Sequence, residues 1–141
     1  MRYETQSDRE HEARIALAVS GVWGVTALRL PALSVADYLL CATSREPPDV
    51  ISLLEIKRRS SAHDTYDTFM LSQTKVRRLL DVGQLLVIES LVVFEFSDGV
   101  YYTTADAIAG ANDVRIGGRH DRGDEGVEAM CHIHHSALGE I

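Results

Sequence analysis

Acidic and basic side chains interrupt two apolar runs of the sequence. Glu55 and Lys57 stand two residues apart at the end of the run 50–57, and Asp37 stands inside the run 35–42. Successive side chains of a strand point to opposite faces, so Glu55 and Lys57 must share one face of a sheet. An acid on an apolar strand is costly to bury unless it is paired or binds a metal. Two acids and one lysine that converge on a sheet therefore indicate a divalent-metal site.

Such a group has the components that metal-assisted phosphodiester cleavage needs. Carboxylate oxygens are ligands for a hard cation, and a lysine beside them steadies charge on the attacking water or on the phosphate. Asp37, Glu55 and Lys57 meet if their two strands are neighbours in a hairpin. A fourth candidate is Glu12, which precedes apolar residues of the first helix by three and four positions and would complete the metal shell from across the sheet.

The elements that must position these residues follow from periodicity and from capping and turn residues. A helix is expected over 7–20, with Ser7 or Asp8 as its N-cap, and a second helix after Ser72, with a buried stripe of Val76, Leu79, Leu80 and Leu86. Strands are expected over 25–30, 35–42, 50–57, 91–96, 100–104 and 128–135, a hairpin turn over 43–48, and a mobile loop over 105–126. The order αβββαββ predicts a single α/β domain.

Composition limits the class of protein. The 141 residues are 45% hydrophobic and 25% charged, as expected for one globular domain. The net charge of −7 argues against a general nucleic-acid coat protein, but basic residues gather between positions 57 and 78 and favour a basic working surface. Two cysteines in apolar runs predict reduced core residues, and no run is long enough to span a bilayer. These features predict a soluble, cytoplasmic protein.

At this point the chain resembles the PD-(D/E)xK nuclease superfamily, which has the restriction-endonuclease-like fold. The resemblance is carried by Asp37 and by Glu55-Ile56-Lys57, set in the order helix, strands, helix, strand, and it covers about residues 7–104. It is closest to small phage nucleases and to Holliday-junction-resolvase-like members. It implies a mixed β-sheet flanked by helices, followed here by the loop 105–126 and a C-terminal strand within 127–141.

The resemblance also implies roles for individual residues. Asp37 and Glu55 would hold Mg²⁺ or Mn²⁺ with the backbone carbonyl of Ile56, Glu12 would join the metal shell, and Lys57 would assist the attacking water. Polar residues of the following helix that would reach the site are Gln73 and Lys75. Ala36 stands where the family motif has proline. Pro48-Asp49 reads as a literal "PD", but it lies only six residues before Glu55, which suits a tight turn, so Asp37 is preferred.

Plainer interpretations stay open for each of these residues. Glu55 and Lys57 would also suit a solvent-facing pair, and Asp37 would also suit an ion pair with Arg29. The run that contains Arg58 and Arg59 is either a solvated strand end or a contact for the phosphate backbone. Lys75 and its neighbouring arginines would serve solubility or backbone contact.

Two further groups are interpreted as structural. In the run 131–135, strand alternation separates His132 and His134 from the Cys131 and His135 side chains, which argues against a zinc site. The aromatic residues Tyr66, Phe69, Tyr101 and Tyr102 are expected in the core or in strands rather than as platforms for base stacking.

The sequence thus predicts a Mg²⁺- or Mn²⁺-dependent nuclease acting on nucleic acid, most reasonably DNA. Arginines of the loop 105–126, namely Arg115, Arg119 and Arg122, are expected to close over the substrate. A homodimer is expected if two strands are cut symmetrically. The alternative is a non-catalytic phage accessory protein on the same fold that binds nucleic acid or a host protein, and a further alternative is a subunit of a larger nuclease.

Overall fold

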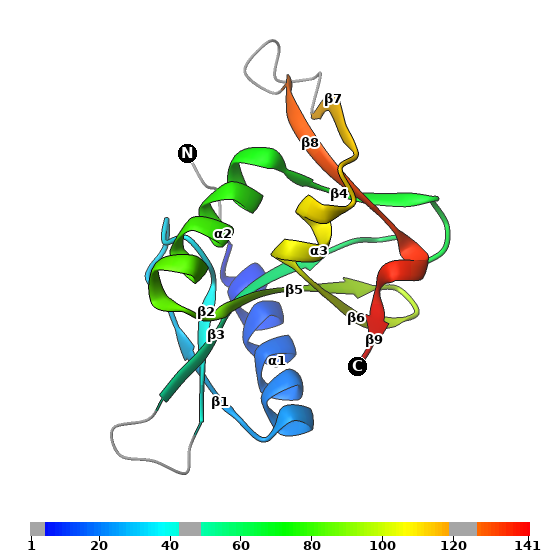
Figure 1. Ribbon diagram of the computed structural model, residues 1–141. Helices are drawn as coiled ribbons and strands as arrows, with labels where there is room; N and C mark the ends of the chain where they lie inside the picture. The colour runs from blue at the N-terminus through cyan, green and yellow to red at the C-terminus, as the bar shows by residue number, and fades with distance from the viewer. Residues whose placement is uncertain (1–4, 43–48, 119–126) are drawn as a thin grey trace.

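The computed structural model describes residues 5–42, 49–118 and 127–141. Their strands form a six-stranded sheet in the order β1-β2-β3-β5-β6-β9 and a three-stranded sheet in the order β4-β8-β7. The first sheet consists of β1 (Thr26–Arg29), β2 (Tyr38–Ala42), β3 (Asp49–Arg58), β5 (Glu89–Phe96), β6 (Gly99–Thr104) and β9 (Gly139–Glu140). The second consists of β4 (Thr68–Ser72), β7 (Val114–Gly118) and β8 (Val127–His134), and the helices are α1 (Gln6–Trp23), α2 (Gln73–Leu86), α3 (Ala105–Gly110) and the short 3-10 helix η2 (His135–Ala137) (Figure 1).

Strand β3 lies in the middle of the larger sheet. It pairs antiparallel with β2 and parallel with β5, and the connection from β3 to β5 runs through β4 and α2. Residues 52–56 of β3 are buried on both faces of the sheet. This burial explains why the strand reads as a nearly continuous apolar run rather than as an alternation, which is typical of central strands with parallel neighbours.

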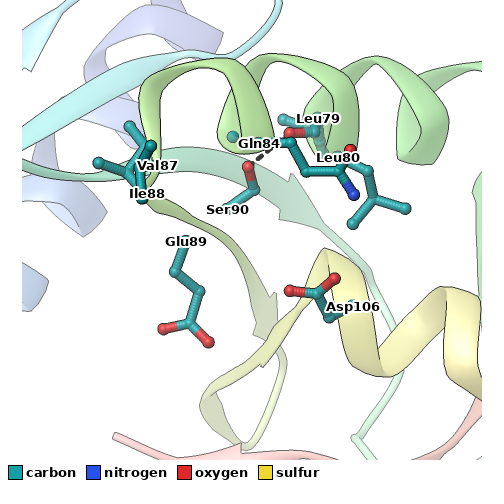
Figure 2. Close-up of a pocket in the computed structure, with 9 residues that line it drawn as sticks. Leu79, Leu80, Gln84, Val87, Ile88, Glu89, Ser90 and Asp106 are labelled. Carbon is teal, nitrogen blue, oxygen red and sulfur yellow. Dashed lines mark hydrogen bonds between the residues drawn. The ribbon is translucent and has the colours of Figure 1, made fainter.

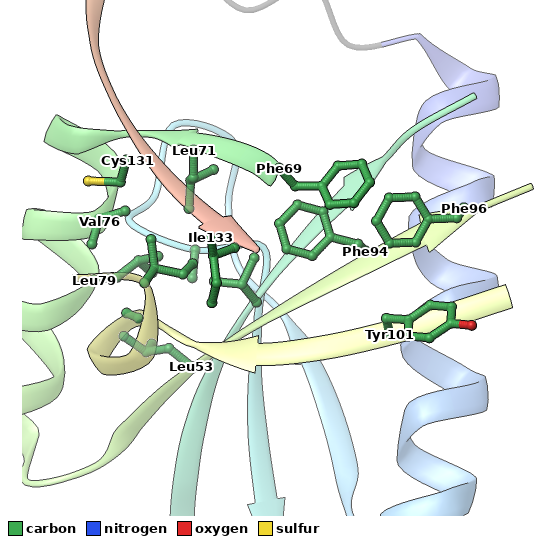
Figure 3. Packing of buried hydrophobic residues seen from close by; sticks show 14 residues of the cluster. Leu53, Phe69, Leu71, Val76, Leu79, Phe94, Phe96, Tyr101, Cys131 and Ile133 are labelled. Carbon is green, nitrogen blue, oxygen red and sulfur yellow. The ribbon is translucent and has the colours of Figure 1, made fainter. Parts of the chain in front are cut away.

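The two long helices belong to opposite faces of this sheet. Ile15 of α1 packs in one buried cluster with Leu54 and Ile56 of β3, whereas Val76 and Leu79 of α2 pack in another cluster that includes Leu53 (Figure 3). Because side chains alternate along β3, Leu54 and Ile56 point to one face while Leu53, Glu55 and Lys57 point to the other. The acid and the lysine of the motif therefore face the side of the sheet that α2 covers.

Helix α1 starts earlier than the sequence indicated. Its N-cap is Thr5 rather than Ser7 or Asp8, and Asp8 is the partner residue of a capping box. The Thr5 hydroxyl accepts a hydrogen bond from the Asp8 amide at 3.1 Å, and the Asp8 carboxylate accepts one from the Thr5 amide at 3.0 Å. These bonds satisfy two backbone donors at the helix start. The helix ends at Trp23, and its C-cap is Gly24, whose φ of 64° is the left-handed conformation that glycine adopts readily.

Helix α2 confirms Ser72 as its N-cap, but its buried stripe differs at the far end. The Ser72 hydroxyl accepts from the Lys75 amide, and Val76 and Leu79 are buried. Leu86 is 52% exposed, so its assignment to the stripe was wrong: it is the last helical residue and falls at the edge of the buried face. Gly83 takes its place on that face, where a Cβ would lie 2.8 Å from the carbonyl oxygen of Ile88.

The Gly, Asp and Arg content of the segment 105–126 predicted a mobile loop. The described part of this segment, residues 105–118, contains a helix and a strand instead. Ala105 and Ile108, three residues apart, are buried in the cluster beside α2 and stabilise helix α3. Strand β7 then pairs with β8, with Val114 opposite Cys131. Arg115 is therefore part of a strand. Arg119 and Arg122 lie outside the described residues, and so does the predicted turn 43–48.

Two other boundaries and several core assignments were tested by the structure. Strand β2 begins at Tyr38 rather than at position 35, and the C-terminal strand ends at His134. Both cysteines are buried and free, as predicted. Phe69 and Tyr101 are buried, but Tyr66 is 63% exposed and lies outside the strands, so its assignment to the core or to a strand was wrong. No helix among the described residues is long and apolar enough to cross a membrane.

Candidate active site

Asp37 and Glu55 lie opposite each other on adjacent strands. Tyr38 is the register partner of Leu54, so one further step places Asp37 opposite Glu55, and directly opposed residues share a face of the sheet. Asp37 precedes β2 by one residue but still bonds to β3, because its amide donates to the carbonyl of Leu54 at 3.0 Å. The sequence therefore predicted the facing pair correctly, although Asp37 is not inside the regular strand.

The Asp37 side chain is also a structural acceptor. It is 6% exposed, and its Oδ2 accepts a 2.8 Å hydrogen bond from the backbone N–H of Ile56. An unpaired buried N–H is costly, so this bond helps to hold the end of β3 against β2. It also fixes the Asp37 carboxylate beside the residue that follows Glu55.

Glu55 is a carboxylate in an unusually poor environment for charge. It is 3% exposed, and burial, together with the nearby charge of Asp37, raises its pKa above the ordinary glutamate value. The ammonium groups of Lys57 and Lys75 oppose this rise in pKa. The acid is therefore held between an acidic neighbour that disfavours its charge and two basic neighbours that favour it.

Two lysines from different elements reach the two oxygens of Glu55. Lys57 Nζ lies 3.4 Å from Oε1, and Lys75 Nζ, from the first turn of α2, lies 3.0 Å from Oε2. The Lys75 contact is charge-assisted and within hydrogen-bond distance, and it opposes the rise in the pKa of the buried Glu55 carboxyl. A buried carboxylate oxygen in this state has a lone pair available for a further positive ligand.

This donor set fits a hard divalent cation. Mg²⁺ and Mn²⁺ prefer oxygen ligands, and Asp37 and Glu55 supply two carboxylates on one face of the sheet. The observation that favours such an ion is that two buried carboxylates, those of Asp37 and Glu55, lie opposite each other on adjacent strands. Asp37 and Glu55 have two formal negative charges, and Lys57 and Lys75 have two formal positive charges beside them.

Glu12 is not brought into this group in the same way. It lies on α1, which packs against the face of β3 opposite to Glu55. Among the described residues, the ligand atoms of Glu12, Asp37 and Glu55 do not form a set within 4.8 Å of one another. Its predicted place in a metal shell is therefore not supported by the geometry of these side chains.

The remaining predicted residues are distributed around the end of β3 and the start of α2. Arg58 points toward α1 and lies 3.4 Å from Glu95, which Arg14 also contacts at 3.2 Å. Arg59 is half-buried, and Gln73 is the first, half-buried residue of α2. Of the two arginines, Arg59 is on the face of the sheet that carries Glu55.

Sequence reasoning missed a cluster formed by His63, Asp64 and Asp98, whose ligand atoms lie within 4.8 Å of one another. His63 Nδ1 lies 2.5 Å from Asp98 Oδ2, and the His63 amide donates to Asp98 Oδ1 at 2.9 Å. The hydrogen bond between the side chains raises the pKa of His63 and lowers that of Asp98. These contacts join the loop after β3 to the β5–β6 turn, a pairing across 35 residues that no local pattern signals.

A separate cavity of about 480 Å³ lies at the C-terminal end of α2 (Figure 2). Its charged lining residues are Glu89 and Asp106, and Ser90 donates to the carbonyl of Leu79 inside it. An acid-lined cavity is a poor binding site for phosphate. The lining of this cavity therefore does not suit the phosphodiester chemistry expected from the sequence.

Comparisons with known proteins show the family and the fold of the chain. The whole chain, residues 1–141, matches the family described as "Phage putative PDDEXK endonuclease". Among solved structures, the Holliday junction resolvase Hjc from the archaeal hyperthermophile Archaeoglobus fulgidus superposes with a TM-score of 0.59 at 15% identity, covering 92% of this chain and 88% of that one. D212, a nuclease from a fusellovirus, superposes with a TM-score of 0.58 at 13% identity, covering 99% of this chain and 90% of that one.

No protein with a curated description matches the chain. The two structural likenesses establish a restriction-endonuclease-like fold, with its mixed sheet and flanking helices. The family match covers every residue, including those that carry the Asp37 and Glu55-Ile56-Lys57 pattern. The chain is therefore a member of the phage PDDEXK endonuclease family.

Proposed function

We propose that this protein is a divalent-metal-dependent nuclease that cleaves phosphodiester bonds in DNA. The observation that carries the proposal is the buried Glu55 carboxylate, placed opposite Asp37 and contacted by Lys57 and Lys75. Asp37 and Glu55 would hold Mg²⁺ or Mn²⁺, with the Ile56 carbonyl as a further ligand. A metal bound there would polarise the scissile phosphate and make a bound water more acidic.

The protein's own side chains have distinct parts in this proposal. Lys57, one-third exposed and beside Glu55, would orient the attacking water and stabilise negative charge that develops at the phosphate. Lys75 would contribute a second positive charge from the other side of Glu55. Glu12 would act on the metal only through an intervening water, because the geometry does not place its carboxylate with the other two.

Plasmid nicking by the purified protein tests the proposal. We expect cleavage with Mg²⁺ or Mn²⁺, none with EDTA, and a loss of at least roughly 100-fold in Lys57→Ala, the size of effect seen when one charge-stabilising group is removed. Arg9→Ala, an exposed substitution on α1, is the control for loss of a cation. Unchanged cleavage by Lys57→Ala would contradict the mechanism. Failure of the wild-type protein to cleave or to bind Mn²⁺ would favour the non-catalytic alternative.

We further propose that the protein acts as a homodimer, because symmetric cutting of two strands favours a two-fold arrangement of sites. Light scattering coupled to size exclusion measures this directly. A monomer over the concentration range in which cleavage is observed would contradict the dimer without affecting the chemistry proposed for the site.

A further inference from the structure

A cavity of about 410 Å³ lies beyond the end of β3, between that strand, β4 and the β7–β8 pair, and Arg59 lines it. The Arg59 amide donates to the carbonyl of Glu95 at 2.8 Å, so the β3–β5 ladder continues one residue past Arg58. Alternation then places Arg59 on the same face as Glu55 and Lys57. The four residue steps from Glu55 to Arg59 correspond to about 13 Å along the strand. The cavity is therefore the next feature along the face that carries the proposed active site.

Two arginines present donors to this cavity. Arg59 uses two of the five N–H groups of a guanidinium on the carbonyl oxygens of Arg58 and Met70, at 3.0 and 3.1 Å. Its guanidinium also lies 5.8 Å from the centre of the Phe94 ring, so its position is fixed by packing. Arg115 of β7 is held by two hydrogen bonds to Asp113, at 3.0 and 2.8 Å. Anchored guanidinium groups with further donors suit a phosphate.

The rest of the lining suits a flat, partly apolar group. Tyr66 and Met70 are 63% and 41% exposed, and Phe69 forms the buried wall beside them. His132 bonds through Nδ1 to the Thr68 hydroxyl at 2.7 Å. A neutral imidazole in this position offers hydrogen bonding without adding charge. Exposed aromatic side chains next to arginines are a combination found where bases of single strands stack.

We propose that this cavity holds one unpaired nucleotide of the substrate, with its base against Tyr66 and Met70 and its phosphate on Arg59 and Arg115. The proposal rests on the proposed function, because it assumes a nucleic-acid substrate at Glu55. Asp67 also lines the cavity and Asp113 is paired with Arg115, so the positive charge on offer suits a single phosphate at most rather than a chain of them. A base inside a duplex cannot enter such a cavity without leaving the stack, so the preferred substrate has a single-stranded segment beside the cleaved bond.

The test is binding, measured by fluorescence anisotropy in EDTA so that no cleavage takes place. A labelled thymidine decamer is compared with a decamer of abasic residues that has the same phosphates. We expect the wild-type protein to bind the thymidine decamer about ten-fold more tightly, as stacking of one base allows. Tyr66→Ala, on an exposed loop, should reduce this preference to less than about two-fold, and Met70→Glu should do the same by placing a negative charge in the cavity. Leu86→Glu, an equal charge change on α2, should keep the preference.

Equal binding of the two decamers by the wild-type protein would overturn the inference, as would a preference that survives in both Tyr66→Ala and Met70→Glu. The proposed nuclease function fails by a different result. A protein that prefers the thymidine decamer but never cleaves DNA with Mg²⁺ or Mn²⁺ retains the nucleotide cavity and loses the metal mechanism. A protein that cleaves DNA and binds both decamers equally retains the mechanism and loses the cavity.

Discussion

Substitutions of Asp37 separate two contributions that the structure assigns to one side chain. Its Oδ2 accepts a hydrogen bond from the backbone N–H of Ile56. Its negative charge repels that of Glu55 and would attract a metal ion. Asp37→Ala removes both contributions, whereas Asp37→Asn keeps an oxygen that can accept the hydrogen bond and removes the charge. The two variants should therefore differ in stability but agree in metal binding.

The size of the stability difference follows from the hydrogen bond. A bond to a charged acceptor contributes about 1.5–3 kcal/mol, and relief of repulsion with Glu55 offsets part of its loss. Asp37→Ala should therefore lower the free energy of unfolding by roughly 1–2 kcal/mol, which corresponds to a fall in Tm of roughly 3–8 °C for a chain of this size. Asp37→Asn should stay within about 0.5 kcal/mol of wild type.

Thermal unfolding followed by circular dichroism at pH 7, without divalent ions, measures the first effect, and calorimetric titration with MnCl₂ measures the second. Both variants should bind Mn²⁺ at least roughly 100-fold more weakly, since loss of a partner that merely orients a ligand already weakens binding about 10- to 100-fold. An asparagine variant as unstable as the alanine variant would refute the assignment of Asp37 as acceptor for Ile56. Wild-type affinity for Mn²⁺ in either variant would refute its assignment as a ligand.

Three further predictions concern Glu55 and its surroundings. Burial raises the pKa of Glu55, so the metal-free protein should lose stability as the pH rises from the ordinary glutamate pKa through the raised pKa. Over that pH range, the Tm of Glu55→Gln should increase relative to the Tm of the wild-type protein. A difference in Tm that does not change with pH would contradict this. Lys75→Met removes an ion pair to Glu55 Oε2 and should raise the pKa of Glu55 further. Mn²⁺ binding by this variant should therefore require a higher pH than binding by the wild-type protein. An unchanged pH dependence of Mn²⁺ binding would argue against the contact between Lys75 and Glu55. Gly83→Ala places a Cβ 2.8 Å from the Ile88 carbonyl oxygen and 3.0 Å from Ser90 Oγ. Denaturant titration should therefore show a free energy of unfolding that is lower by about 1–3 kcal/mol. A stabilised variant would show that the end of α2 moves to make room for the methyl group.

The part of the site that could be predicted from sequence is the part controlled by one strand and its neighbour. Alternation along β3 places Glu55 and Lys57 together without knowledge of the rest of the fold. The hairpin expectation brought Asp37 to the same face, and the register of β2 and β3 confirms that it lies opposite Glu55. The burial of β3 on both faces could be predicted from the sequence, because few polar residues interrupt its apolar run.

The other parts depend on contacts between distant segments. Helix α3 and strand β7 were not predicted, because the Gly, Asp and Arg around them outweigh the few buried residues such as Ile108. Strand β7 also pairs with β8, a strand near the C-terminus, and a local pattern does not signal this pairing. The position of Lys75 on Glu55 depends on how α2 docks on the sheet, which sequence periodicity does not specify. Glu12 was grouped with the acids from its place on the apolar stripe of α1, but that stripe faces the opposite side of β3.

A crystal structure of the protein soaked in MnCl₂ tests the central claim most directly, because anomalous scattering identifies the ion. The account predicts Mn²⁺ in contact with the carboxylates of Asp37 and Glu55, with Lys75 moved away from Glu55 Oε2. Mn²⁺ bound only at His63, Asp64 and Asp98, with the Glu55–Lys75 contact intact, would contradict it.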